Sequence, residues 1–212
     1  MQGPKLYVRM NEKEVILRPL EKKELPTIIE GFSDLEVIQY VGRMSVPTLD
    51  MEEEWFKKET ESKTSFIWGI EYRKKLIGVT DLHDINGTSA STGVIIWEKK
   101  LWGQGLVSMA HLARTWFASE ILNIHLIRSH VWNPNIASKK ALERLGYTVT
   151  GKQYFKKFHM GDWLDLIELL WINPRYSNIF LENRKDCSDM YTDSLKRAQE
   201  ALDLAKEVVN FN

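Results

Sequence analysis

The stretch KKLWGQGLVSMAHLARTWF, residues 99–117, sets Gly103 and Gly105 directly before a run of apolar residues with helical spacing. A β-branched segment at residues 93–98 precedes the two glycines and predicts a strand. The first turn of a helix leaves amide groups unpaired and concentrates partial positive charge. A strand, a glycine turn and a helix in this order therefore predict an anion site, with a phosphate as the expected guest.

Two common phosphate loops do not fit these residues. A P-loop needs a glycine, four residues and then Gly-Lys-Ser/Thr, and the chain has no such run. The dinucleotide fingerprint needs a third glycine or alanine where Ser108 stands, and it opens the first βαβ unit of a chain rather than lying halfway along. The expected phosphate therefore belongs to another class of ligand.

Patterns on both sides of the glycine turn predict a mixture of strands and helices. Leu106 opens an amphipathic helix that has His111 and Arg114 off its apolar stripe, and residues 86–92 carry an Asn-Gly turn signal and predict a loop. Further strands are predicted within residues 7–20, 65–72, 75–85, 123–132, 148–158 and 162–172, and further helices around residues 21–34, 50–62 and 133–147.

The length and composition predict one main domain with an extension. The chain has 212 residues, of which 43% are hydrophobic, enough for one well-buried core. We expect the domain at residues 1–173 and a C-terminal helical extension at residues 174–212, with a helix from 188 to 209. The apolar stripe of that helix must be buried, either on its own domain or on a second subunit, so a homodimer is one of two expectations.

Charge and cysteine content exclude several classes of partner. Lysine plus arginine and aspartate plus glutamate both number 29, so no net field attracts nucleic acid or an acidic membrane surface. Cys187 is the single cysteine and the five histidines lack metal-ligand spacing, so we expect no metal. The N-terminal residues 1–10 have no apolar signal core, and we expect a cytoplasmic protein without membrane contact.

The segment from Lys100 to Gly105 resembles the Gln/Arg-x-x-Gly-x-Gly/Ala element of the GNAT superfamily of N-acetyltransferases. Its context is similar as well, in the order VILRPL, KLIGVTDL, GVIIWEKKLWGQG, NIASKKALERLGY and a closing strand pair around MGDW. The resemblance runs from Val15 to Ile172 and is to the branch with ribosomal-protein N-terminal acetyltransferases and many small-amine acetyltransferases. It implies a layered α/β fold with a mixed, mostly antiparallel sheet that is splayed in the middle and flanked by helices.

The resemblance also implies acetyl-coenzyme A as co-substrate. The strand backbone at Gly93, Val94, Ile95 and Ile96 is expected to pair with the pantetheine arm and to polarise the acetyl carbonyl. Asn135, in Asn-x-x-Ser with Ser138, matches the residue that contacts the coenzyme arm. The pyrophosphate turn is expected to consist of Lys100, Leu101, Trp102, Gly103, Gln104, Gly105 and Leu106. Lys100 replaces the usual glutamine or arginine, a change that backbone binding should tolerate.

The expected reaction is acetyl transfer to a primary amine by direct attack. The leaving thiolate of coenzyme A has a pKa near ~8.5 and needs only a modest proton donor. Leu142 stands where many family members carry a tyrosine. In the branch with ribosomal-protein acetyltransferases a serine three residues after the asparagine is the proposed donor, and Ser138 stands in that place, so the resemblance implies Ser138 as the candidate acid. An equal alternative is that Ser138 is a helix-start serine that satisfies backbone amides.

A base is needed because an alkyl amine with a pKa of roughly 10 is almost fully protonated at pH 7. His130 stands where some relatives carry a glutamate, and a neutral imidazole can accept the proton. The alternative interpretation is that His130 is a strand histidine that faces a polar rim. Glu98, which is otherwise a solvated strand-end carboxylate, is the second candidate base. His83, Tyr154 and His159 are candidates for the acceptor side.

The acceptor itself is left open by the sequence. It is a peptide N-terminus, an amino sugar or aminoglycoside, a polyamine, or an amino-acid-like metabolite. A module that binds acyl-coenzyme A, has weak catalysis and works through protein partners is the alternative to an enzyme.

Overall fold

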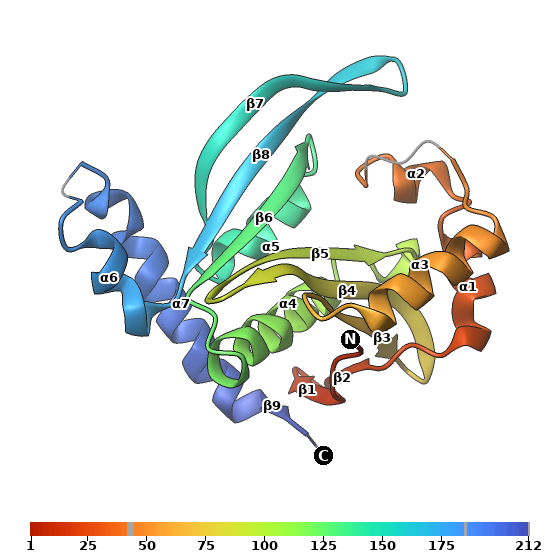
Figure 1. Cartoon of the computed structure of the whole chain (residues 1–212), viewed down its shortest axis with the longest axis horizontal. Coiled ribbons are helices and arrows are strands. Elements are labelled where there is room, and N and C mark those ends of the chain that lie inside the picture. Colours follow the sequence, from red (N-terminus) through yellow and green to blue (C-terminus); the bar gives the residue numbers. More distant parts are fainter. Residues whose placement is uncertain (42–44, 185, 212) are drawn as a thin grey trace.

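One open nine-stranded sheet organises the residues that the structure, a computed structural model, describes: 1–41, 45–184 and 186–211 (Figure 1). The strands are Leu6–Met10 (β1), Lys13–Arg18 (β2), Phe66–Tyr72 (β3), Lys75–Asn86 (β4), Ser89–Ile96 (β5), Leu126–Asn133 (β6), Thr148–His159 (β7), Asp162–Ile172 (β8) and Val209–Asn210 (β9). Their order is β7-β8-β6-β5-β4-β3-β2-β1-β9. Every neighbouring pair is antiparallel except β5 and β6, which are parallel. The expected mostly antiparallel, splayed sheet is confirmed.

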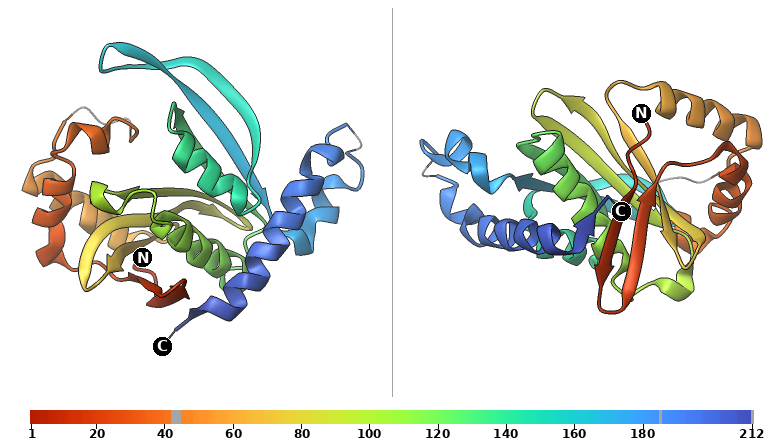
Figure 2. Two further views of the ribbon diagram at one scale, coloured as in Figure 1. Left: turned by 180° about the vertical axis from the view of Figure 1, so that it is seen from behind. Right: turned by 90° about the horizontal axis from the view of Figure 1, so that it is seen from below.

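Helices cover both faces of the sheet (Figure 2). They are Lys22–Glu24 (η1), Leu25–Gly31 (α1), Leu35–Ile38 (α2), Leu49–Glu61 (α3), Lys99–Leu101 (η2), Leu106–Trp116 (α4), Phe117–Ile121 (η3), Ile136–Arg144 (α5), Pro174–Tyr176 (η4), Ser177–Leu181 (α6) and Ser188–Val208 (α7). The helices α1 and α3 pack on one face through a small cluster that includes Leu25, Ile28 and Ile67. The main core lies on the other face, under α4 and α7. Across the described ranges, no helix combines the length and apolar character needed to cross a membrane.

Two central strands are longer than the sequence patterns predict. β5 begins at Ser89, so most of the loop predicted at residues 86–92 is strand, because its small side chains alternate and turn Ala90 and Thr92 into the core. β4 continues to Asn86, so His83 lies within a strand. These longer strands carry the sheet up to the point where it opens.

His111 and Arg114 are fully buried, so the prediction that they lie off the packed stripe of α4 is wrong. The physical reason is that α4 is enclosed. It contacts β1, β2, β4 and β5 of the sheet on one side, and α5 and α7 on the others. A helix surrounded in this way has little solvent-facing surface, so polar side chains on it must find internal partners.

The C-terminal helix α7 buries its apolar stripe on its own chain. Ala198, Leu202 and Ala205 join the main core, and β9 adds two residues to the edge of the sheet beside β1. A Cβ on Gly146, which has φ +89°, would lie 2.6 Å from the Cβ of Ala198, so glycine permits the close approach of α7 to the end of α5. The apolar stripe of α7 is therefore buried on its own domain, which is one of the two expected locations.

Leu202→Ala tests whether α7 belongs to the core. Leu202 is 5% exposed and Leu204, two residues further along, is 38% exposed. We expect Leu202→Ala to lower the free energy of unfolding in urea by about 2–4 kcal/mol, because it removes buried methyl groups and leaves a cavity. The matched control Leu204→Ala should cost less than about 1 kcal/mol. Equal small losses for both variants would contradict the packing described here.

Candidate active site

The site is built where β5 and β6 part. The two strands pair in parallel through Ser89–Thr92 and Leu126–Ser129 and then diverge. Beyond that point β5 stays paired with β4, and β6 stays paired with β8. The edges Gly93–Ile96 on β5 and His130–Asn133 on β6 therefore flank the gap, and those of their backbone amides and carbonyls that have no partner in the chain are open to a ligand. An extended ligand in this fork gains strand-like hydrogen bonds.

A groove of about 760 Å³ occupies the fork. The expected cofactor residues that line it are Gly93, Val94, Ile95, Ile96, Leu101, Trp102, Gly103, Gly105, Leu106, Asn135 and Ser138. The structure thus brings together residues from β5, the glycine turn and the start of α5. Lys100 and Gln104 are not among the residues that line the groove in the described chain.

The glycine turn is held in shape by its own polar contacts. Gly103 and Gly105 have φ values of +74° and +84°, a region that favours glycine. The Gln104 side chain donates to the carbonyl oxygen of Lys100 at 2.8 Å, and the Lys13 ammonium donates to the carbonyl oxygen of Gln104 at 2.8 Å. Gln104 therefore stabilises the turn from outside the groove.

The first turn of α4 offers free amides to a ligand. The first helical hydrogen bond runs from the Met109 amide to the Gly105 carbonyl oxygen at 3.1 Å. The amides of Leu106, Val107 and Ser108 precede this bond, so they have no partner within the helix. Gly105, the N-cap residue, has no side chain to occupy them. This is the anion-binding arrangement that the opening stretch of sequence predicts.

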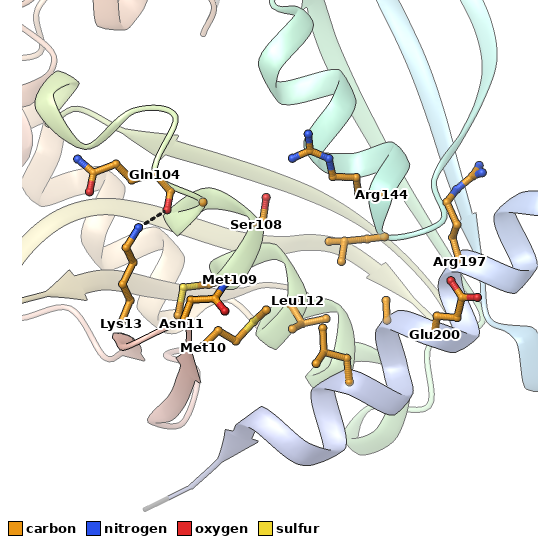
Figure 3. Close-up of a pocket in the computed structure, with 14 residues that line it drawn as sticks. Met10, Asn11, Lys13, Gln104, Ser108, Met109, Leu112, Arg144, Arg197 and Glu200 are labelled. Carbon is orange, nitrogen blue, oxygen red and sulfur yellow. Dashed lines mark hydrogen bonds between the residues drawn. The ribbon is translucent and has the colours of Figure 1, made fainter.

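A second cavity of about 400 Å³ lies behind the glycine turn (Figure 3). It shares Gly105, Ser108 and Arg144 with the groove, so the two spaces meet at the start of α4. Its apolar lining comes from Met10, Met109, Leu112, Leu145, Ala201 and Leu204. Its rim carries Lys13 on one side and Arg144 and Arg197 on the other, with Glu200 beside Arg197.

The start of α5 presents Asn135 and Ser138 to the groove. The Asn135 side chain accepts a hydrogen bond from the Ser138 amide at 3.1 Å and so caps the helix. The capping role considered for Ser138 thus belongs to Asn135. Leu142, in the position where many relatives have a tyrosine, is buried and lines the groove.

The face of the sheet on the α1 and α3 side carries a histidine–aspartate pair. Nδ1 of His83 lies 2.9 Å from Oδ1 of Asp81, and the same carboxylate oxygen accepts the Gly93 amide at 2.7 Å. The hydrogen bond that His83 makes to the Asp81 carboxylate raises the pKa of His83, against the opposing effect of partial burial. Asp81 was missed by sequence reasoning because nothing in the run KLIGVTDL shows that its side chain reaches the neighbouring strand.

His130 is the candidate base that lines the groove. It lies on β6 just beyond the parting point, is exposed, and is paired across the strands with Glu168 of β8. Glu98 is exposed after the end of β5 and lies outside the groove lining among the described residues.

The acceptor candidates on the long β7–β8 hairpin have different surroundings. Tyr154 is 66% exposed, and the Lys152 ammonium lies 4.2 Å from the centre of its ring. His159 is buried at the end of β7, where its backbone lies opposite that of Asp162 on β8. His83, Tyr154 and His159 are all absent from the described lining of the groove.

A buried guanidinium fixes the carbonyl of Gly93. Arg114 of α4 is fully buried, and one of its terminal nitrogens donates to the Gly93 carbonyl oxygen at 2.9 Å and to the Thr80 hydroxyl at 2.6 Å. Asp81 holds the amide of the same glycine. Both polar groups of Gly93 are therefore committed, and the residue at the base of the fork is rigidly placed.

Comparisons with known proteins agree with this geometry. A model of the acetyltransferase (GNAT) domain family matches residues 14–148. No curated protein sequence matches the chain.

Solved structures of acetyltransferases share the fold. A spermidine N-acetyltransferase from Vibrio cholerae, in complex with coenzyme A and spermine, is 24% identical, with a TM-score of 0.70 over 77% of this chain and 98% of that chain. A ribosomal alpha-N-protein acetyltransferase in complex with coenzyme A is 15% identical, with a TM-score of 0.67 over 78% and 97%. An acetyltransferase described as putative is 18% identical, with a TM-score of 0.64 over 92% and 96%.

The His83–Asp81 pair predicts a pH-dependent contribution to stability. A histidine whose pKa is raised by folding stabilises the protein fully below its unfolded pKa of about 6.5, and this contribution is lost as the pH rises through the folded pKa. The His83 side chain is 42% exposed, so solvent screening keeps the contribution below about 1 kcal/mol.

Urea unfolding of the wild type and of His83→Gln at about pH 5.5 and about pH 8.5 measures this contribution. We expect the wild type to exceed the variant by more at the acidic pH. The same difference at both pH values would show that the pair adds no charge-dependent stability.

Proposed function

This chain belongs to the GNAT acetyltransferase family and is an acetyl-CoA-dependent N-acetyltransferase, and from that premise we propose that the β5–β6 fork binds the acetyl-pantetheine arm. The observation that carries the proposal is the pair of strand edges that part beyond Thr92 and Ser129 and enclose the groove. The amides of an extended arm suit such edges, and a phosphate suits the free amides at the start of α4.

We propose that the nucleotide end of the coenzyme extends toward the second cavity. The cavity begins at Ser108, in the first turn of α4, and combines an apolar lining with three cationic side chains. The apolar lining suits a purine ring, and the cationic side chains suit a phosphate group. Lys13, Arg144 and Arg197 would then neutralise phosphate charge at its rim.

The residues of the groove suit amide formation. A backbone amide on the Gly93–Ile96 edge would stabilise the oxyanion, which needs a placed donor and no particular side chain. The Ser138 hydroxyl, in the groove wall, would donate a proton to the departing thiolate. These two groups serve the developing oxyanion and the departing thiolate, and the reaction needs in addition a base for the amine.

His130 is our candidate for that base. It lines the groove beside the parting point, and a neutral imidazole accepts a proton near pH 7. The His83–Asp81 pair lies on the same face of the sheet as His130 and is the second candidate. Glu98 lies beyond the end of β5 and outside the described lining of the groove.

We infer that the acceptor is a peptide α-amino group and not a polyamine. Among the described residues that line the groove none is aspartate or glutamate. A polycation is bound mainly through carboxylates, so this lining does not favour it. An α-amino group has a pKa of about 7.7–8.0, so a histidine is a sufficient base for it, unlike for an alkyl amine with a pKa near ~10.

The β7–β8 hairpin supports a peptide as the acceptor. It carries exposed apolar side chains, including Phe155, Phe158 and Trp163, which are 69%, 58% and 54% exposed. Lys156 and Lys157 lie between the two phenylalanines. Aromatic and cationic side chains on one projecting strand pair suit an extended peptide of neutral or acidic character.

Ser108→Asp tests the anion site with opposite effects on stability and binding. An acid in the first turn of α4 should raise the stability of the free protein slightly, because it complements the helix dipole. The same charge should repel the pyrophosphate and weaken acetyl-CoA binding by about 10-fold, measured by calorimetry. The neutral control Ser108→Asn should bind within about 3-fold of the wild type. Unchanged affinity in Ser108→Asp would contradict this placement of the pyrophosphate.

The acceptor is tested by release of coenzyme A thiol from acetyl-CoA. Peptides with a free α-amino group and neutral or acidic first residues should give kcat/KM at least about 10-fold above that of spermidine, because no carboxylate is among the described residues of the groove lining. The same peptides with a blocked N-terminus serve as controls and should be inactive. Faster turnover of spermidine than of every peptide would refute the acceptor class.

A further inference from the structure

Two buried polar side chains on α4 are not explained by the reaction as derived above. His111 is 1% exposed and Arg114 is 0% exposed, and both lie among the buried apolar residues Ala110, Leu112 and Ala113 of the helix. Their closest contact joins a terminal nitrogen of Arg114 to Nδ1 of His111 at 2.6 Å. Arg114 also reaches the Gly93 carbonyl, so the pair connects the helix to the base of the fork.

The contact determines which nitrogen of His111 carries the proton. A guanidinium has only donors, so Nδ1 of His111 must be the acceptor. In a neutral imidazole the proton then lies on Nε2. Burial, with Arg114 nearby, lowers the pKa of His111 well below its usual value and keeps the ring neutral. Nε2 is therefore a fixed hydrogen-bond donor.

This donor has no partner within the described chain. Nε2 of His111 is buried and makes no hydrogen bond. His111 is nevertheless one of the residues that line the groove, together with Thr92 and Ser129, the last paired residues of the fork. Buried donors are almost always satisfied, so an unsatisfied one on a residue that lines a binding groove calls for a partner from outside the chain, a ligand atom or a water molecule.

We propose that Nε2–H of His111 donates a hydrogen bond to an amide carbonyl oxygen of the pantetheine arm, and that Arg114 is the residue that positions it. The inference rests on the proposed placement of the coenzyme in the fork. The arm offers amide carbonyl oxygens as acceptors, which coenzyme A and acetyl-CoA share, and an arm between the parting strands runs along the groove that His111 lines. His111 would thus be a cofactor-binding residue supplied by the helix beneath the fork.

Two substitutions of His111 separate its bond to Arg114 from its bond to the ligand. His111→Asn places an amide oxygen near the position of Nδ1, so Arg114 keeps an acceptor, and it leaves no group at the position of Nε2. His111→Gln carries an amide nitrogen far enough to donate from the position of Nε2. Thermal unfolding without ligand checks that both variants are folded.

Calorimetry with two ligands measures the effect. We expect His111→Asn to weaken coenzyme A binding about 10-fold and His111→Gln to stay within about 3-fold of the wild type. Both variants should bind the adenosine bisphosphate half of the coenzyme as the wild type does, because that half lacks the arm. Wild-type affinity for coenzyme A in His111→Asn would overturn the proposal, as would an equal loss for both ligands. Failure of the wild type to bind coenzyme A would overturn the proposed function instead.

A measurement on the wild type avoids dependence on the variants. Imidazole ¹⁵N–¹H NMR observes the Nε2 proton of His111 directly. Coenzyme A should shift this signal downfield, and adenosine bisphosphate should leave it in place. A signal that coenzyme A does not move would overturn the proposal.

Discussion

The structure depends on the fact that β5 and β6 share only a short parallel ladder. Each strand has a long antiparallel partner on its other side, β4 for β5 and β8 for β6. These partners hold the two halves of the sheet in different orientations once the ladder ends at Thr92 and Ser129. A gap in the middle of a sheet exposes backbone groups that need hydrogen-bond partners. The fork is therefore stable only when a ligand or water supplies these partners.

The helix α4 closes the fork from below and supplies its polar chemistry. Its first turn offers amides beside Gly105, and its middle carries the buried pair His111 and Arg114. Arg114 and Asp81 together hold both polar groups of Gly93. A charged group on an enclosed helix is costly unless it is hydrogen-bonded, and the bonds of Arg114 to the Gly93 carbonyl and the Thr80 hydroxyl offset this cost and hold the strand edge in place. The extension α7 packs on the same helix and adds Arg197 to the rim of the second cavity.

Much of this arrangement follows from local sequence, and some of it does not. The glycine turn is predictable because Gly103 and Gly105 need positive φ. The helix after it and the order of strands are predictable because the spacing of apolar residues reports burial. The early start of β5 was missed because Ser89 and Ser91 read as a loop. The burial of His111 and Arg114 was missed because a polar residue off an apolar stripe usually faces solvent, and only packing on several sides reverses this. The side-chain contacts of Asp81 were beyond reach, since they cross from one strand to the next.

The central claim is that coenzyme A lies between the two parted strands. Backbone ¹⁵N–¹H NMR of the uniformly labelled protein, recorded before and after saturation with coenzyme A, tests it without any substitution. The account predicts the largest shift changes on both sides of the fork, in residues 93–96 and 129–132, and in the turn at residues 103–108. Changes confined to α1 and α3, or to one strand of the fork, would contradict it.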